Sequence, residues 1–184
     1  MAAVTKVAAF GAAIRIYYFA VGGLVWSWRP ILIAISIATM AIGTVIAIAQ
    51  KDVKRVLAYS AIAHSGFLLT GIIALSKDGL DAILIYLFTY GFATIGTFAI
   101  VTLVRDSGGE VSDLNRWVGL GKRSPLVAGT FTLFLLGLAG IPLTSGFVGK
   151  FAIFSAAYKS GNISVVVVGV LASAIAAFFY VRII

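Results

Sequence analysis

Three side chains of this largely apolar sequence have the chemistry to carry a proton: Lys6, His64 and Lys150. Each lies within or beside a long apolar run, where an ionisable group is expensive and therefore marks a candidate functional site. Lysine and histidine can both exchange protons near neutral pH when their surroundings favour the neutral form. We therefore predict proton transfer as the chemistry of this chain.

Lys150 stands in the stretch "GIPLTSGFVGKFAIF", residues 140–154. It lies eight residues after Pro142 and nine before Lys159, so its side chain reaches neither membrane surface if this segment crosses the bilayer once. A helix break at Pro142 would free backbone carbonyls and admit water at that depth, as in transporters. The alternative is a lysine at a helix end that extends its side chain to the surface.

His64 follows Lys54 by ten residues, about 15 Å along a helix. This distance places it near the middle of the membrane, and Ser60 lies four residues earlier on the same helical face. An imidazole at this depth suits a proton relay because its unperturbed pKa lies near neutrality. The alternative is a histidine that only packs between helices through hydrogen bonds.

Hydroxyl groups recur on the segment after His64. Tyr86, Tyr90 and Thr94 follow one another at a spacing of about four residues, with Thr89 and Thr97 beside them. Together with Ser60, the first three could line a file of water molecules between the titratable groups. They could equally form ordinary hydrogen bonds between helices.

Lys6 is close to a membrane surface if its helix begins at residue 1, and deep if that helix begins upstream. Its surroundings, "TKVAAFGAA" at 5–13, resemble "GKFAIFSAA" at 149–157 around Lys150. Weak internal similarity of this kind is typical of transporters that are built from repeats with sites near the membrane midplane. These residues alone leave both depths open, and we expect a role for Lys6 inside the membrane mainly because the chain resembles a known family.

The composition identifies an integral membrane protein. Of the 184 residues, 61% are hydrophobic and 11% charged, and the mean hydropathy is +1.12, whereas soluble domains are about a quarter charged. Cysteine is absent and there is a single histidine, so the sequence suggests no metal site. Gly-rich phosphate loops, nucleophile–base pairs and haem-type histidine pairs are absent from the sequence. We expect no redox cofactor on this chain.

The chain divides into apolar segments that can cross a bilayer, each about 20 residues long. Four unbroken segments come first and a fifth comes last: 3–22, 30–50, 56–76, 81–104 and 162–184. Both ends of the chain run directly into an apolar helix, so we expect a fragment of a longer polytopic protein.

The segment 125–158 is too long for one straight crossing and too short for two. Pro142 removes a backbone donor and clashes with the preceding turn, so it favours one crossing that is broken there. A hairpin is the alternative. The predicted fold is thus an all-α polytopic membrane protein with about six transmembrane helices, the fifth broken at Pro142, in a single membrane domain over 1–184.

The basic residues support this topology and indicate which side faces the cytoplasm. The net charge is +8, but these residues lie mainly in short segments between apolar runs, which indicates membrane topology and no nucleic-acid partner. With one broken crossing, one side collects Lys51, Lys54, Arg55, Arg105, Arg116, Lys122, Arg123 and Arg182, and the other collects Arg29, Lys77 and Lys159. By the positive-inside rule, the loops at 51–55 and 105–124 are cytoplasmic.

Two motifs resemble a known family. "AQKDVKRVLAYSAIAHSGFLLTGIIA" (49–74) and "LAGIPLTSGFVGKF" (138–151) are similar to the antiporter-like subunits of proton-pumping NADH:quinone oxidoreductase, respiratory complex I, and of the related multisubunit cation/proton antiporters. Within the family the chain is most similar to the N type, because the M type typically has glutamate where Lys150 stands and the L type a Ser-Lys-Asp-Glu pattern. The resemblance covers essentially all 184 residues.

The resemblance implies a fourteen-helix fold, of which this chain forms helices eight to thirteen, with the twelfth broken. It places Lys6 on the helix-eight lysine, His64 on the helix-ten histidine and Lys150 on the helix-twelve lysine of a central hydrophilic axis. Protons pass along this axis while quinone reduction elsewhere in the complex drives the change. The family's helix-five glutamate and helix-seven lysine would lie upstream of Met1.

The resemblance also implies partners and location. They are the other membrane-arm subunits, the lipid bilayer and the bacterial plasma membrane, with FMN, iron–sulfur clusters and quinone held by other subunits. Two alternatives stay open: a subunit of a cation/proton antiporter without a redox partner, and a purely structural membrane module in which Lys6 and Lys150 only reach toward the surface.

Overall fold

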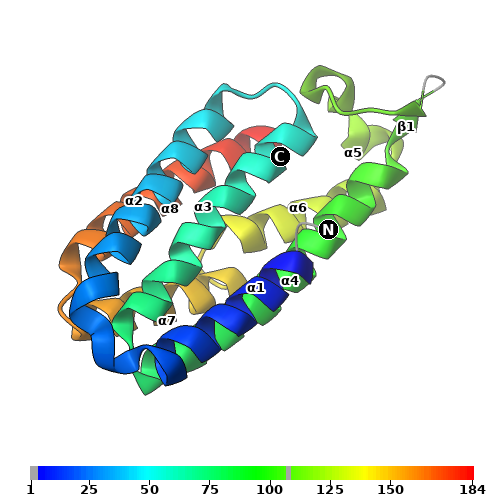
Figure 1. Cartoon of the computed structure of the whole chain (residues 1–184). Coiled ribbons are helices and arrows are strands. Elements are labelled where there is room, and N and C mark those ends of the chain that lie inside the picture. Colours follow the sequence, from blue (N-terminus) through cyan, green and yellow to red (C-terminus); the bar gives the residue numbers. More distant parts are fainter. Residues whose placement is uncertain (1–3, 107–108) are drawn as a thin grey trace.

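The structure is a computed structural model, which describes residues 4–106 and 109–184. It is a bundle of helices with one small β-ribbon at one end (Figure 1). The elements follow in the order α1 (Val4–Ile14), α2 (Val25–Ala49), α3 (Val53–Ala74), α4 (Lys77–Leu103), β1 (Arg105–Asp106), β2 (Gly109–Glu110), α5 (Leu120–Arg123), α6 (Pro125–Ala139), α7 (Ser145–Lys159) and α8 (Ile163–Ile183).

Four stretches are long and apolar enough to cross a membrane: Gly22–Ala49, Val53–Ala74, Lys77–Leu103 and Ile163–Ile183. Several of these begin earlier than the apolar runs predicted. The second span starts before residue 30 because α2 continues through Pro30, which lies inside the helix and removes one of its backbone hydrogen bonds. The chain is therefore a multi-pass membrane protein, and the count of six spans stays a prediction.

The first predicted span, 3–22, is not one regular helix. After α1 the chain continues as a π-helical turn over Arg15–Ala20 and a 3₁₀ turn over Gly22–Leu24 before α2 begins. The Tyr18 hydroxyl on the π-helical turn donates to the Ser76 carbonyl at 3.1 Å, which ties this turn to the α3–α4 connection. The interruption of the predicted span 3–22 depends on such tertiary contacts, which hydropathy does not predict.

Segment 125–158 is a single column in two pieces, α6 and α7, which run antiparallel along the whole of α4. Gly96 of α4 lies against Phe134 of α6, and Gly149 of α7 lies against Tyr86 of α4. Figure 1 places α6 toward the end of the bundle with α5 and β1, and α7 toward the opposite end. The arrangement is a broken crossing and not a hairpin, as predicted.

The break itself spans residues 140–144 and has clear local causes. Gly140 ends α6 in a left-handed conformation, φ +74°, which glycine adopts without strain. Pro142 follows in the turn, and Leu143 is also left-handed, φ +79°. The Thr144 hydroxyl then accepts from the Phe147 amide at 3.4 Å and caps the start of α7. The break predicted at Pro142 is confirmed.

The connection 105–124 forms more structure than the predicted loop. β1 and β2 pair antiparallel, with Arg105 opposite Glu110, and the following residues fold back onto the α2–α3 turn. The Val53 amide donates to the Ser112 carbonyl at 2.8 Å, and the Leu114 amide donates to the Lys51 carbonyl at 3.0 Å. The two basic segments therefore lie at the same end of the bundle.

Candidate functional site

Lys150 is buried against the end of α6, and its ammonium group has three hydrogen-bond acceptors. Nζ donates to the Leu138 carbonyl at 3.1 Å, the Ala139 carbonyl at 2.8 Å and the Ser173 hydroxyl at 3.1 Å. The two carbonyls are available because α6 ends at Ala139 and its last carbonyls have no amide in the helix to bind. The helix break thus makes the site that holds the lysine.

The packing around Lys150 fixes its position. The residue is 3% exposed, and its side chain lies over Gly140, where an added Cβ would come within 3.2 Å of Nζ. Nζ also lies 5.0 Å from the centre of the Phe67 ring, a distance at which a cation is attracted by the ring face. The acceptors of Lys150 are two carbonyls and a hydroxyl, which carry no net charge, whereas Lys54 and Lys159 form ion pairs.

His64 lies at the centre of a hydrogen-bonded chain of side chains from three helices. Its Nδ1 is 2.5 Å from the Tyr86 hydroxyl of α4, and its Nε2 is 3.2 Å from the Tyr180 hydroxyl of α8. The Tyr180 hydroxyl donates to the Ser60 hydroxyl of α3 at 2.7 Å. All four residues are buried, so these hydrogen bonds are shielded from solvent and lipid.

Lys6 reaches the same group of side chains from α1. Its Nζ donates to the Ala61 carbonyl of α3 and to the Tyr90 hydroxyl of α4, the latter at 3.1 Å. The same nitrogen lies 5.0 Å from the centre of the Tyr90 ring. Lys6 is half-buried, whereas Lys150 is buried.

Aromatic rings connect the three predicted proton carriers in a defined order. The His64 ring lies 4.8 Å from that of Tyr90, which contacts Lys6, and 5.5 Å from that of Phe67, which contacts Lys150. The structure therefore brings Lys6, His64 and Lys150 into one cluster with His64 in the middle. Phe67 has no group that can relay a proton, so a path to Lys150 must go around its ring.

A small cavity of about 10 Å³ lies beside His64 at the helix break. This is about the volume that one water molecule needs. Its walls include His64, Tyr86, Tyr90, Ser145 and Leu138, and the Leu138 carbonyl also accepts from Lys150. The cavity thus adjoins both the imidazole and the site that holds the lysine.

The four hydroxyl residues predicted to line water divide into two pairs. Tyr86 and Tyr90 line the small cavity. Ser60 and Thr94 are buried elsewhere, Ser60 as the far end of the His64 chain and Thr94 one turn beyond Tyr90. A water-lining role remains a prediction for all four.

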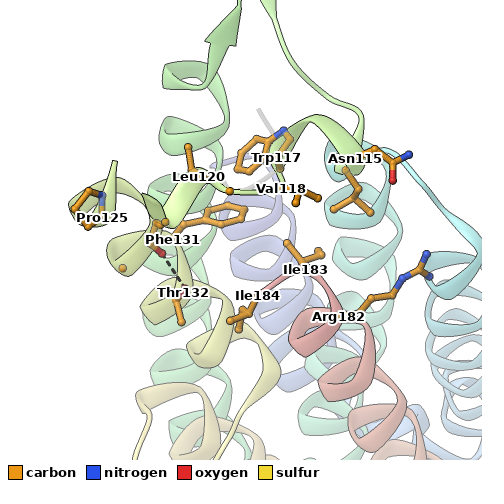
Figure 2. A pocket seen from close by; sticks show the side chains of 15 residues that line it. Asn115, Trp117, Val118, Leu120, Pro125, Phe131, Thr132, Arg182, Ile183 and Ile184 are labelled. Atoms are coloured by element: carbon orange, nitrogen blue, oxygen red, sulfur yellow. Dashed lines mark hydrogen bonds between the residues drawn. The ribbon is translucent and has the colours of Figure 1, made fainter. Parts of the chain in front are cut away.

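A cavity of about 680 Å³ lies away from this cluster at the end of the bundle. It is formed by α5, α6, the end of α8 and the connection before α5, with Trp117 and Phe131 on one wall (Figure 2). Arg182 is the one charged residue among those that line it, and Figure 2 shows its side chain directed away from them. Within the described part of the chain, no group of three or more His, Cys, Asp and Glu residues could hold a metal ion.

Three important contacts were missed by sequence reasoning: Ser173 on Lys150, Tyr180 on His64, and Phe67 between the two. Ser173 and Tyr180 both lie on α8, a helix that appeared only as an apolar span. Their spacing of seven residues puts them on one helical face, and this was the signal available in the sequence.

Comparison with known proteins identifies one family and several similar proteins. The family model described as "NADH:quinone oxidoreductase/Mrp antiporter, TM" matches residues 1–176. NADH-quinone oxidoreductase subunit N of Rhodococcus opacus is 60% identical over 184 residues, which are 100% of this chain and 34% of the relative. NADH-quinone oxidoreductase subunit N 3 of Streptomyces griseus is also 60% identical over the whole chain, and 33% of it is covered.

Solved structures of an Mrp complex and of a respiratory complex I contain chains that are similar to this one. A chain of the Mrp complex from Dietzia sp. is 29% identical with a TM-score of 0.88, covering 95% of this chain and 32% of that one. A chain of respiratory complex I from Thermus thermophilus is 33% identical with a TM-score of 0.73, covering 83% of this chain and 34% of that one. The chain therefore spans about a third of the length of the proteins it matches.

Proposed function

Since the chain belongs to the NADH:quinone oxidoreductase/Mrp antiporter transmembrane family, we propose that it is part of a membrane-arm subunit of a bacterial NADH:quinone oxidoreductase, and that it carries protons through the membrane. The observation that carries the proposal is the buried Lys150, whose ammonium donates to three neutral oxygens at a helix break. The identity of 60% to a third of the length of two subunit N proteins, over the whole of this chain, supports this choice of complex.

In this proposal, Lys150 is the terminal proton carrier, Lys6 the inner one and His64 the relay between them. The neutral surroundings of Lys150 matter because a proton can leave without stranding a buried carboxylate, which would be costly. The small cavity offers room for about one water molecule on the path around Phe67. Tyr86 and Tyr90 present hydroxyls at the same place.

The rest of the complex supplies the driving reaction. We propose that NADH oxidation and quinone reduction take place on other subunits, which hold FMN and iron–sulfur clusters, and that this chain binds none of them. Its partners are then the neighbouring membrane-arm subunits and the lipid bilayer. We propose a bacterial inner membrane as the location, with the loops 51–55 and 105–124 facing the cytoplasm, because the positive-inside rule favours that side for their basic residues.

Replacement of Lys150 by alanine in the intact complex tests the proposal. We expect proton pumping and coupled quinone reduction to fall by about tenfold or more, as is usual when a proton-transfer group is removed. NADH oxidation by an artificial electron acceptor should stay unchanged, because that reaction needs no proton path through the membrane. Unchanged pumping would overturn the assignment of Lys150.

A second candidate is a subunit of a cation/proton antiporter, favoured by the TM-score of 0.88 to a chain of the Mrp complex. It predicts sodium-dependent proton exchange in everted membrane vesicles without added NADH. The first proposal predicts proton uptake that requires NADH. This one assay therefore separates the two.

A further inference from the structure

His64 has a tyrosine hydroxyl at each ring nitrogen, and this arrangement constrains its protonation form. Tyr86 lies 2.5 Å from Nδ1 and Tyr180 lies 3.2 Å from Nε2. A neutral imidazole has one nitrogen that donates and one that accepts, and the partner of each nitrogen decides which is which. The directions of the two tyrosine hydroxyls therefore fix the tautomer.

The hydrogen bonds of Tyr180 and Ser60 determine which way the Tyr180 hydroxyl donates. The Tyr180 hydroxyl donates to Ser60 Oγ at 2.7 Å, and Ser60 Oγ donates to the Leu57 carbonyl at 3.1 Å. A phenol has only one hydrogen to donate, so the Tyr180 oxygen can only accept from His64. Nε2 then carries the hydrogen, and Nδ1 accepts from the Tyr86 hydroxyl.

We propose that Tyr180 is a positioning residue that fixes the ring orientation and the tautomer of His64, so that Nδ1 on the Tyr86 side is the nitrogen that takes up and releases the proton. This inference rests on the proposed function and deepens it. It assigns a role to a residue of α8 that touches neither lysine in the described contacts, with Ser60 as the acceptor that holds the Tyr180 hydroxyl in place.

Only Nδ1 of His64 gains and loses a proton in this step. A hydrated proton on the Tyr86 side forms an N–H bond with the Nδ1 lone pair, water is left behind, and the ring gains one positive charge. Nε2–H stays bound to Tyr180 throughout, and the Tyr86 hydroxyl turns so that its oxygen accepts from Nδ1–H. Release breaks the same Nδ1–H bond and restores the neutral ring. The small cavity is lined by His64 and Tyr86 but not by Tyr180.

Tyr180→Phe in the intact complex tests the proposal, because it keeps the buried ring and removes only the hydroxyl. Without that acceptor, Nε2–H is unpaired in an apolar interior and the imidazole is free to turn or change tautomer. We expect the rate of proton pumping to fall about fivefold, the factor in a rate or population that corresponds to one hydrogen bond. Unchanged pumping would overturn the inference.

A double-mutant cycle with His64→Gln separates positioning from packing. If Tyr180 acts through His64, Tyr180→Phe causes no further loss when His64 is already replaced. A purely structural role gives the same fractional loss in both backgrounds and would contradict the proposal. So would a His64→Gln variant that pumps normally.

Ser60→Ala is the second variant and decides the matter if the Tyr180 variant does not assemble. It leaves the packing nearly unchanged and frees the Tyr180 hydroxyl to turn toward Nε2. We expect a loss of pumping that again disappears in the His64→Gln background, and no loss would overturn the inference.

Tyr18→Phe is the matched control, because it removes a tyrosine hydroxyl that binds the Ser76 carbonyl at 3.1 Å and does not contact His64. Its pumping should equal that of the unmodified complex, and a loss as large as that of Tyr180→Phe would contradict the inference. Lys150→Ala shows which proposal has failed. If Lys150→Ala stops pumping while Tyr180→Phe does not, only the positioning role is wrong; if neither does, the proposed function is wrong as well.

Discussion

Helix α7 carries two lysines nine residues apart that have opposite surroundings. Lys150 is buried and donates to two backbone carbonyls and a serine hydroxyl. Lys159, in the last turn, is 66% exposed at its side chain and pairs with the Asp78 carboxylate at 2.8 Å. The same residue type therefore forms an ion pair at the surface and a set of neutral hydrogen bonds inside.

The difference follows from the cost of burying charge. A carboxylate beside Lys150 would attract it, but both ions would have to leave water, and the loss of one proton would strand the other charge. Backbone carbonyls carry no net charge, so the lysine can gain or lose its proton without leaving an unpaired ion. At the surface, water screens both partners, so the Lys159–Asp78 pair is of little consequence for stability.

The largest expected effect comes from disturbing the close contact between α6 and α7 at the break that makes the interior site. A Cβ on Gly146 would lie 1.8 Å from the Gly137 carbonyl oxygen, so Gly146→Ala must push α6 and α7 apart. We expect a destabilisation of about 3 kcal/mol or more, since the clash is with backbone. Thermal unfolding of the purified complex measures it, together with the amount assembled.

Gly129→Ala is the control for this substitution. Gly129 lies on α6, the helix that Gly146 of α7 approaches, but an added Cβ there meets nothing within 4 Å. It should be neutral or slightly stabilising because alanine favours the helix. Equal thermal stability of the two variants would show that the close contact of α6 and α7 at the break does not contribute to stability.

A smaller effect is expected from Ser173→Ala, which removes one of the three acceptors of Lys150. The two carbonyls remain, so we expect a several-fold loss of proton pumping that is clearly smaller than the loss in Lys150→Ala. Ser164→Ala is the matched control, because Ser164 is an exposed serine on the same helix. A loss in both variants, or in neither, would contradict a specific role for the Ser173 hydroxyl.

The smallest effect concerns Lys54 and Glu110, which form an exposed ion pair as Lys159 and Asp78 do. The hydrogen bond and charge of Lys54 hold the pKa of Glu110 below its usual value. Because the pKa is lower in the folded state, the pair stabilises the 109–114 segment above the unfolded pKa. This contribution is lost as the pH falls through the lowered pKa of Glu110 in the folded protein. Both side chains are exposed, so solvent screening keeps the effect small.

Amide hydrogen exchange of residues 109–114 detects this effect. At neutral pH, Glu110→Gln should exchange slightly faster than the unmodified protein after correction for intrinsic rates, and the difference should vanish at the acid end. A difference that persists at low pH would show that the ion pair is not its cause.

The features that local sequence determines were predictable. Hydropathy and length predict the long helices, and Pro142 predicts the break, because a missing backbone donor acts within one or two turns. The burial of Lys150 followed from that break and the segment length. Ser60 and His64 were expected on one face of α3, and both do belong to one hydrogen-bonded chain.

The features that depend on distant contacts were not predictable. Ser173 and Tyr180 meet their partners across 23 and 116 residues of sequence, and a serine or tyrosine in an apolar helix gives no sign of its partner. The β1–β2 ribbon has strands of only two residues each, too short for an alternating pattern. The π-helical turn at Arg15–Ala20 likewise carries no breaker residue that would announce it.

The most direct test of the account compares the two lysines of α7 in one assay. Lys150→Gln and Lys159→Gln remove the same charge from the same helix, and everted membrane vesicles report protons taken up per NADH oxidised. We predict that the Lys150 variant loses most of this ratio while the Lys159 variant keeps it. Equal ratios in the two variants would contradict the claim that the buried lysine at the helix break carries the proton.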